Sequence, residues 1–342
     1  MIRGALAIGS NKAAEQAASA VLDGVGTAVD AVIGGFLAHA GVEAGVLLAP
    51  TVAIVAGVGA GARVIDGRTL QPGKGAPRPR GFKSEAEVPL AARIGVPRSL
   101  GVMTLLHASR GRTSLAQLVK PGVLAAENAG ATARAQLLRR IGTSGQTALR
   151  SDEFVGAMVA AAGPVVGGVV TVEDLEMALP DDVPAKSTNI GDDTAVIGVP
   201  WDSPLGRFPE AEVILASDGR GIVVALAYVP ARTEDGLSVP ELGIVLGKHA
   251  HPVRRGIPRT KPGTPLDMPA PIAVTMRAGT ATAVALLGKV GVGAETLTGV
   301  VDAWSTDGKL EEVRAQTKAR AVLALLRDAR DARVLRAAED GG

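Results

Sequence analysis

The chain is 342 residues long, with 36 basic and 34 acidic side chains, and it is 47% hydrophobic but only 2% aromatic. A chain of this length can bury a large core, which here must consist mainly of Ala, Val, Leu and Ile. The near-balance of charge and the shortage of rings on which bases could stack argue against a nucleic-acid partner. The absence of cysteine excludes disulfides, thiolate nucleophiles and cysteine metal sites.

The first forty residues predict two helices. The stretch "NKAAEQAASAVLDG" (11–24) places Ala and Leu at helical spacing and ends on a glycine, which is a common helix stop. In "TAVDAVIGGFLAHAG" (27–41), Thr27 is a suitable N-cap for a second, almost wholly apolar helix. Further helices are expected over 99–108, 113–129, 131–141 and 151–162.

The uncharged run from Ala44 to Ala62 has almost the length of a membrane span. Pro50 and a series of glycines interrupt it, so we expect buried strand and loop instead, with strand character over 51–66 and no membrane partner. The first residues contain too short an apolar run for a signal peptide, and we therefore expect a cytoplasmic protein.

The pattern changes after residue 180. Thr171 is expected to cap a short helix within 167–180, with Asp174 at its third position. Strand-like runs follow at 194–199, 211–217, 221–229, 242–247, 271–276 and 280–288. The stretch 309–339, rich in charge pairs four residues apart, predicts a long closing helix.

This order of elements predicts an α+β protein. We expect a helix-rich half over 1–180 and a strand-rich half over 181–342 that ends in the long helix. The boundary is expected near 181–190, and the two halves together are expected to form one compact domain.

The first half resembles the γ-glutamyltransferase family of the N-terminal-nucleophile hydrolases. Three segments carry the resemblance: "GVGTAVDAVIGG" is similar to the family's "GGNAVDAA", "IDGRTLQP" to "DGRETAP", and "VVGGVVTVEDLEMA" to "GGLLTLEDLAAY". The residues between them follow the family pattern that begins V-P-G. The resemblance implies a four-layer αββα sandwich. It also implies that Arg68 descends from the arginine that binds the α-carboxylate of a γ-glutamyl group, although the turn Asp66-Gly67 alone is compatible with a solvated hairpin arginine.

The nucleophile of the family has no counterpart at the matching position. Members cut their own chain before a threonine that opens a strand, and the new terminal amine then activates the threonine hydroxyl. The matching strand here is "EVILASDGRGIVV" (212–224), preceded by Pro209, Glu210 and Ala211. None of these three residues carries a hydroxyl or thiol, so we expect no self-cleavage.

The substrate-binding positions also differ. Lys248, His249 and His251 stand where the family has amide and acid groups that hold the substrate's amino group. Asp267 replaces a serine pair, and the glycines of the family's oxyanion hole become "GKVGVG" (288–293). A carboxylate at Asp267 would repel the substrate carboxylate.

These departures predict a shortened family member with a degenerate site, a pseudoenzyme with a structural or protein-interaction role. We expect no catalytic residue, and a vestigial Arg68 that is paired with Asp267. The protein is expected to form a homo-oligomer or to bind a protein partner. The alternative is an active transferase or amidohydrolase with a relocated nucleophile, in which Thr188 or the neighbouring Ser187 of "KSTN", or Thr194, takes the role.

No cofactor or metal is expected. His249 and His251 could face the same side of a strand, but no third ligand is visible near them. The carboxylates of "GDD" (191–193) together with Asp202 could bind a divalent cation, but we expect a polar turn there instead. The glycines of "GVGAGA" lack the third glycine and the following helix of a dinucleotide-binding motif.

Overall fold

The computed structural model describes residues 5–57, 61–76, 81–190, 194–202, 204, 209–277, 280–292, 309–327 and 332–338. Its helices are α1 (Lys12–Asp23), α2 (Ala28–Val42), α3 (Ser99–Arg110), α4 (Leu115–Leu118), α5 (Lys120–Asn128), α6 (Thr132–Ser144), α7 (Asp152–Ala162), α8 (Val172–Glu176) and α10 (Lys309–Thr317). Its 3-10 turns are η1 (Glu85–Glu87), η2 (Leu90–Arg93), η3 (Gly145–Arg150) and η4 (Pro164–Val166). Its strands are β1 (Leu6–Gly9), β2 (Thr51–Gly57), β3 (Gly61–Gly67), β4 (Asp181–Pro184), β5 (Lys186–Ile190), β6 (Thr194–Gly198), β7 (Glu212–Ser217), β8 (Ile222–Tyr228), β9 (Leu237–Val239), β10 (Ile244–Leu246), β11 (Ile272–Arg277), β12 (Thr280–Leu287), β13 (Ala321–Arg327) and β14 (Ala332–Ala338).

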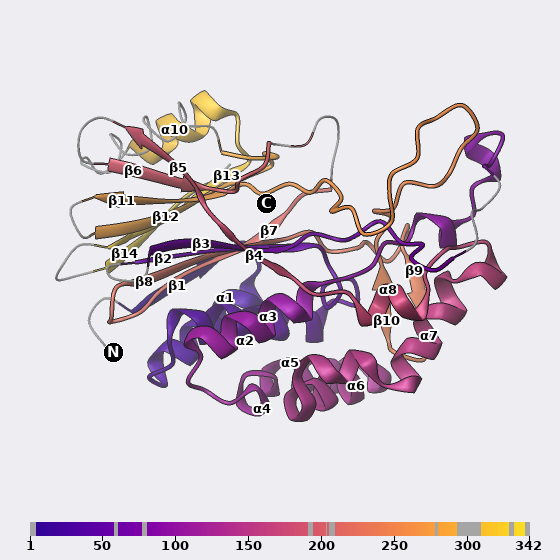
Figure 1. The fold of residues 1–342 in the computed structure, drawn as a ribbon. Coiled ribbons are helices and arrows are strands. Elements are labelled where there is room, and N and C mark those ends of the chain that lie inside the picture. Colours follow the sequence, from indigo (N-terminus) through magenta and orange to yellow (C-terminus); the bar gives the residue numbers. More distant parts are fainter. Residues whose placement is uncertain are drawn as a thin grey trace.

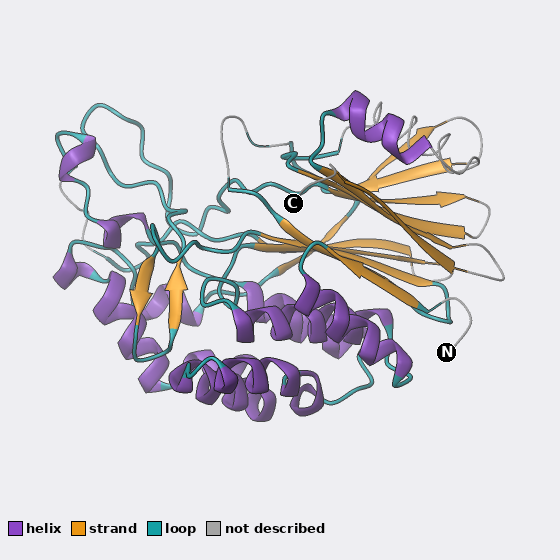
Figure 2. Ribbon diagram, turned by 180° about the vertical axis from the view of Figure 1, so that it is seen from behind, coloured by secondary structure: helices purple, strands orange, loops and turns teal. Residues whose placement is uncertain are grey.

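Two six-stranded sheets stack face to face at the centre of the molecule (Figure 1). The first has the strand order β1-β7-β8-β2-β3-β4 and the second the order β14-β13-β12-β11-β6-β5, while β9 and β10 form a separate hairpin. The helices of the first half of the chain lie on one side of this pair of sheets, and α10 lies on the other (Figure 2). The layers therefore follow the order αββα, which confirms the expected α+β fold.

Side chains of the central strands alternate between two apolar cores. In β8, Val223 and Ala225 face the second sheet, whereas Val224 and Leu226 face the helices. Successive side chains of a strand point to opposite faces, so a strand buried on both faces has a continuous apolar sequence. A third apolar cluster joins α10 to the outer face of the second sheet.

Local capping signals set the beginnings of two helices. At α2 the Thr27 hydroxyl accepts the backbone N–H of Asp30 at 3.1 Å, and the Asp30 carboxylate accepts the backbone N–H of Thr27 at 2.9 Å. Thr171 and Asp174 make the same reciprocal pair at α8. Both N-caps were predicted from the sequence, and Gly24 ends α1 as predicted.

Helices α2 and α5 touch at two glycines. A methyl group on Gly41 would lie 2.0 Å from the carbonyl oxygen of Gly122, and one on Gly122 would lie 2.1 Å from the carbonyl oxygen of Leu37. The helix backbones therefore approach each other directly, which suits a core built from small aliphatic residues.

The predicted closing helix over 309–339 is wrong beyond Thr317, where α10 ends. The chain continues instead as β13 and β14, a hairpin that forms one edge of the second sheet. Leu323 faces the space between the sheets and Val322 faces α10, so this short apolar run is buried on both faces as a strand. Pairing of β13 with β12 overrides the helical preference of the flanking charged residues.

The boundary expected near 181–190 is the point at which the chain passes from one sheet to the other. β4 is an edge strand of the first sheet and β5 is an edge strand of the second, with Ala185 between them. The first sheet nevertheless combines β1, β2 and β3 with β7 and β8, so the two halves of the chain share it. In the described ranges no helix combines the length and the apolar character needed to cross a membrane.

Candidate functional site

Arg68 directly follows β3 at the end of the first sheet. The turn expected at Asp66-Gly67 is wrong, because both residues continue β3 and pair with Val52 and Thr51 of β2. The Asp66 carboxylate accepts the backbone N–H of Arg68, just beyond the strand, at 2.9 Å. The same carboxylate binds the guanidinium, with Arg68 Nε 3.1 Å from each carboxylate oxygen and Nη2 2.9 Å from Oδ2. The side chains of Arg68 and Asp66 are only 14% and 5% exposed. Arg68 is therefore a largely buried, internally paired cation and not a solvated hairpin arginine.

A second arginine, which the sequence analysis missed, shares the Asp66 carboxylate. Arg98 Nη2 lies 3.2 Å from Asp66 Oδ1, and Arg98 Nη1 lies 2.7 Å from Asp181 Oδ2. Arg98 also donates to the backbone carbonyls of Arg68 at 2.7 Å and Leu179 at 3.0 Å. A signal was present in the sequence, because Arg98 stands where the family pattern has the glycine of V-P-G.

Trp201 covers the face of the Arg68 guanidinium, whose central carbon lies 3.8 Å from the ring centroid. Trp201 follows β6 and therefore reaches Arg68 from the second sheet. The buried Trp201 Nε1 has no hydrogen-bond partner in the described part of the chain. A cation against an aromatic face is stabilised by the ring quadrupole, most strongly where water is excluded. We call Asp66, Arg68, Arg98, Asp181 and Trp201 the Arg68 cluster.

The structure brings Arg68 and the position of the missing nucleophile to the same end of the first sheet. Glu212 and Gly67 lie in one row of cross-strand partners that passes through β8 and β2. Three strand spacings, roughly 14 Å, separate the two ends of this row. Arg68 follows one end and Glu210 precedes the other, as the resemblance implies.

The beginning of β7 has no reactive side chain at the expected position. The Glu210 carboxylate forms an ion pair with Arg320 Nε at 2.8 Å. A serine hydroxyl does lie nearby: Ser10 Oγ donates to the Glu212 carboxylate and accepts the backbone N–H of Val213 at 2.8 Å. No local motif marks Ser10, because it reaches β7 only through the pairing of β1 with that strand. This hydroxyl joins two strands through a backbone contact.

The two candidate threonines lie in different surroundings. Thr194 is buried at the beginning of β6, and Trp201 follows the other end of that strand, so Thr194 lies away from the Arg68 cluster. Thr188 is exposed in the middle of β5 and lines a cavity of about 240 Å³ together with Lys186 and Trp201. Of the two threonines, only Thr188 lines the cavity that Trp201 also lines.

Lys248, His249 and His251 do not converge on one point. Lys248 Nζ forms an exposed ion pair with Asp235 at 3.1 Å, and His251 Nδ1 lies 3.0 Å from Thr260 Oγ1. The buried Nε2 of His249 has no hydrogen-bond partner among the described residues, and burial lowers the pKa of this imidazole to about 4. Over the described ranges no three His, Cys, Asp or Glu side chains are grouped as metal ligands would be. Residues 191–193, considered above with Asp202, lie outside those ranges.

The expected contact between Arg68 and Asp267 is not among those of the described residues. Asp66 holds the guanidinium instead, and the Asp267 side chain is exposed. Leu266 donates its backbone N–H to Thr69 at 2.8 Å and is buried, so the next side chain along this extended segment points outward. Of the glycine-rich segment 288–293, residue 293 lies outside the described residues.

Comparison with known proteins identifies the fold. No protein-family model matches the chain, and no curated protein matches it in sequence. Among solved structures, LmbA2991 matches with a TM-score of 0.76 and 14% identity over 99% of this chain and 97% of that chain. Cephalosporin acylase from Bacillus halodurans matches with a TM-score of 0.72 and 13% identity over 100% of this chain and 97% of that chain.

A γ-glutamyltranspeptidase from Pseudomonas nitroreducens matches over 58% of this chain and 72% of that chain, with 17% identity and a TM-score of 0.49. The structural neighbours are N-terminal-nucleophile hydrolases. At 13–14% identity the two full-length matches show a shared fold, and the fold that the resemblance implied is therefore confirmed.

Proposed function

We propose that this chain is a γ-glutamyltransferase-like protein without acyl-transfer activity, which acts in the cytoplasm as a structural or interaction protein. The observation that carries the proposal is the Arg68 cluster. The arginine that would bind a substrate carboxylate already binds Asp66 at its edge and Trp201 on its face. A substrate would have to displace a buried ion pair, and breaking such a pair costs on the order of 3–5 kcal/mol.

The beginning of β7 supports the same proposal. An N-terminal nucleophile needs a hydroxyl or thiol on the residue whose amine acts as the base. Proline, glutamate and alanine at 209–211 supply no such group, and Glu210 is engaged with Arg320. Without the nucleophile, the shared fold supplies only a scaffold.

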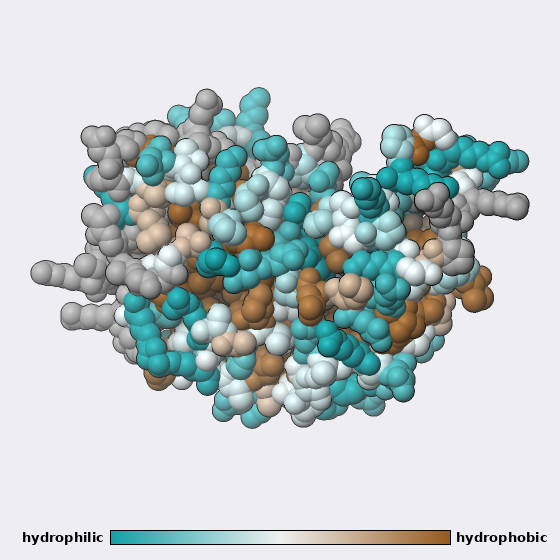
Figure 3. Space-filling model, in the orientation of Figure 1, coloured by the Kyte–Doolittle hydropathy of each residue, from teal (hydrophilic) through white to brown (hydrophobic). Residues whose placement is uncertain are grey.

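An exposed apolar patch supports a role in protein interaction. From η4 to the residues before β4, the exposed apolar side chains are Val165, which is 98% exposed, Val166, Val172, Met177 and Leu179. Figure 3 shows apolar surface at this end of the molecule. Grouped apolar side chains on a surface commonly mark contact sites, so we place a second copy or a protein partner here.

The second candidate function is an active amidohydrolase or transferase with a relocated nucleophile. The position of Thr188 in the cavity beside Trp201 favours it over Thr194. Thr188 lies within a paired strand, however, and cleavage before it would interrupt β5.

Intact mass under denaturing conditions, together with an assay of γ-glutamyl anilide hydrolysis, tests the proposal. We expect a single chain of 34.5 kDa and hydrolysis at the background rate. Two fragments with a break before Thr188 would overturn the proposal. Hydrolysis that is lost in Thr188→Ala but kept in the matched control Thr194→Ala would overturn it as well.

A further inference from the structure

Strand β5 is an edge strand of the second sheet (Figure 1). It pairs with β6 on one side, and its residues from Lys186 to Asn189 are all exposed. In an antiparallel strand, alternate residues direct both their N–H and their C=O groups away from the neighbouring strand. Within the described ranges, no further backbone group and no side chain bonds to the backbone of β5. The strand therefore presents unpaired backbone donors and acceptors to the solvent.

The other edges of the two large sheets are protected. At β1 the Glu15 carboxylate accepts the backbone N–H of Gly9 at 3.0 Å, and Arg336 donates to the Gly9 carbonyl at 2.9 Å. β4 carries two aspartates and a proline, and β14 carries two arginines. Charged side chains and proline are common means by which natural proteins prevent pairing at an edge. The sequence of β5, "KSTNI", contains no proline and has one charge, at its first residue.

The geometry of a two-fold axis limits how β5 can pair with a second copy of itself. An axis perpendicular to the sheet makes the two strands antiparallel and keeps each side chain on its own face. Directly opposite residues of an antiparallel pair share a face, so residues that face each other must be an even number of positions apart in the sequence. The register that pairs all five residues of β5 is centred on Thr188.

The side chains of β5 match each other in this register. Thr188 faces Thr188 of the second copy, and Ser187 faces Asn189, so hydroxyl and amide groups meet. Lys186 faces Ile190 and not another lysine. The register thus avoids like charges directly opposite each other, which destabilise a strand pair.

We propose that β5 is an interaction surface that pairs antiparallel with β5 of a second copy of this chain, so that the two second sheets become one continuous sheet. Backbone hydrogen bonds supply the affinity of such an added strand, and the side chains supply its register. The inference rests on the proposed interaction role and names a second copy as the partner. The apolar patch between η4 and β4 is then left for a different protein.

Sedimentation equilibrium of the full chain, combined with a charge exchange at Thr188, tests the proposal. For the wild type we expect a particle of twice 34.5 kDa. In Thr188→Lys and in Thr188→Glu like charges face each other across the axis, so the dissociation constant of each dimer should rise by about fivefold to tenfold. An equimolar mixture of the two variants places a cation opposite an anion and should restore dimers that contain one chain of each. Thr188 is exposed, so both variants should keep the wild-type melting temperature when monomeric.

Ser187→Lys is the matched control, because residue 187 faces the neutral Asn189 and not itself. It should weaken the dimer less than Thr188→Lys does. A monomeric wild type, equal effects of these two variants, or a mixture of Thr188→Lys and Thr188→Glu that stays monomeric would overturn the proposed pairing.

Two further outcomes separate failure of this pairing from failure of the proposed function. A dimer that is lost in Val165→Asp but kept in Thr188→Lys would overturn the pairing and place the second copy at the apolar patch, which leaves the interaction role standing. Cleavage before Thr188 would overturn the proposed function and, because β5 would be interrupted, the pairing with it. The two fragments in the intact mass distinguish that outcome from an uncut monomer.

Discussion

Arg68 and Trp201 come from different sheets and meet at the end of the sandwich, with 3.8 Å between the guanidinium carbon and the ring centroid. Replacing Trp201 by alanine should lower the free energy of unfolding by about 1–2 kcal/mol, because a desolvated cation–π contact is lost. Trp201→Phe keeps an aromatic face and should retain most of the stability. Urea denaturation measures both, and equal stability of the two variants would contradict a stabilising contact.

The Asp66 carboxylate serves two buried cations, so its neutralisation should be costly. In Asp66→Asn, Arg68 and Arg98 lose their shared counter-ion, and we expect a loss on the order of 3–5 kcal/mol. Asp267→Asn is the control and should change stability by less than about 0.5 kcal/mol, because this side chain is exposed. A comparable loss in both variants would instead support the pairing of Arg68 with Asp267.

The imidazole of His249, which is half-buried and has a buried Nε2, should make the fold sensitive to acid. Burial lowers its pKa to about 4, so the folded protein takes up this proton less readily than the unfolded chain, whose histidines titrate near pH 6.5. The stability contributed by neutral His249 is therefore complete above about pH 6.5 and is lost progressively as the pH falls toward about 4.

Melting temperatures of wild type and His249→Gln between pH 8 and pH 4 should converge as the pH falls, since the variant lacks this protonation. His251→Gln, which removes an exposed ring, should keep the wild-type dependence on pH. Parallel curves for wild type and His249→Gln would rule out this source of acid sensitivity.

The contact of α2 with α5 should not tolerate a methyl group. Gly41→Ala would place Cβ 2.0 Å from the Gly122 carbonyl oxygen, and the helices must then separate. We expect a loss of about 1–3 kcal/mol or more, as for other overpacked sites. Gly156→Ala, in α7, meets no atom within 4 Å and should gain about 0.5–1 kcal/mol from helix propensity. Thermal melting of the pair distinguishes the packing effect from the propensity effect.

Much of the fold was predictable because its signals are local. Thr27 and Thr171 begin their helices through side chains only three residues away. The central strands β2, β3, β6, β7, β8, β11 and β12 appear as short apolar runs bounded by glycine, proline and aspartate. The polar edge strands β4 and β5 carry no such signal. In the run at 321–326 the apolar residues repeat neither clearly every 2 residues nor every 3.6 residues, so the charged neighbours led to the prediction of a helix. The pairing of this run with β12 makes it a strand.

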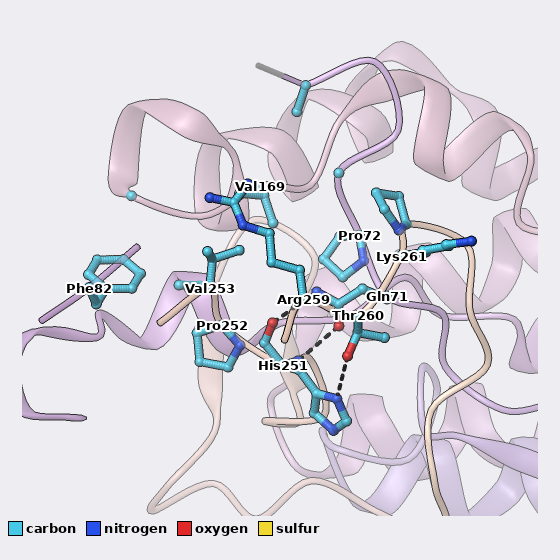
Figure 4. Close-up of a pocket in the computed structure, with 15 residues that line it drawn as sticks. Gln71, Pro72, Phe82, Val169, His251, Pro252, Val253, Arg259, Thr260 and Lys261 are labelled. Atoms are coloured by element: carbon cyan, nitrogen blue, oxygen red, sulfur yellow. Dashed lines mark hydrogen bonds between the residues drawn. The ribbon is translucent and has the colours of Figure 1, made fainter. Parts of the chain in front are cut away.

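The candidate site was predictable only in part. The Asp-Gly sequence and the family motif led to Arg68, but neither showed that Asp66 and Gly67 continue β3 or that the Asp66 carboxylate binds the guanidinium. Arg98 and Trp201 reach the cluster from distant segments, and only the assembled sheets bring them together. The cavity of about 560 Å³ that Gln71 and His251 line (Figure 4) was not predictable either. It depends on the hydrogen bond between these two residues, which lie far apart in the chain.

The shared first sheet determines how a cut chain would behave. Three strand pairs, β1 with β7, β8 with β2 and β3 with β4, join the first half of the chain to the second by backbone hydrogen bonds. A backbone break between the halves would leave these pairs intact, so size exclusion would report an uncut particle and only denaturants would release the fragments. The two halves are thus complementing pieces of one folding unit, and each should fold only in the presence of the other.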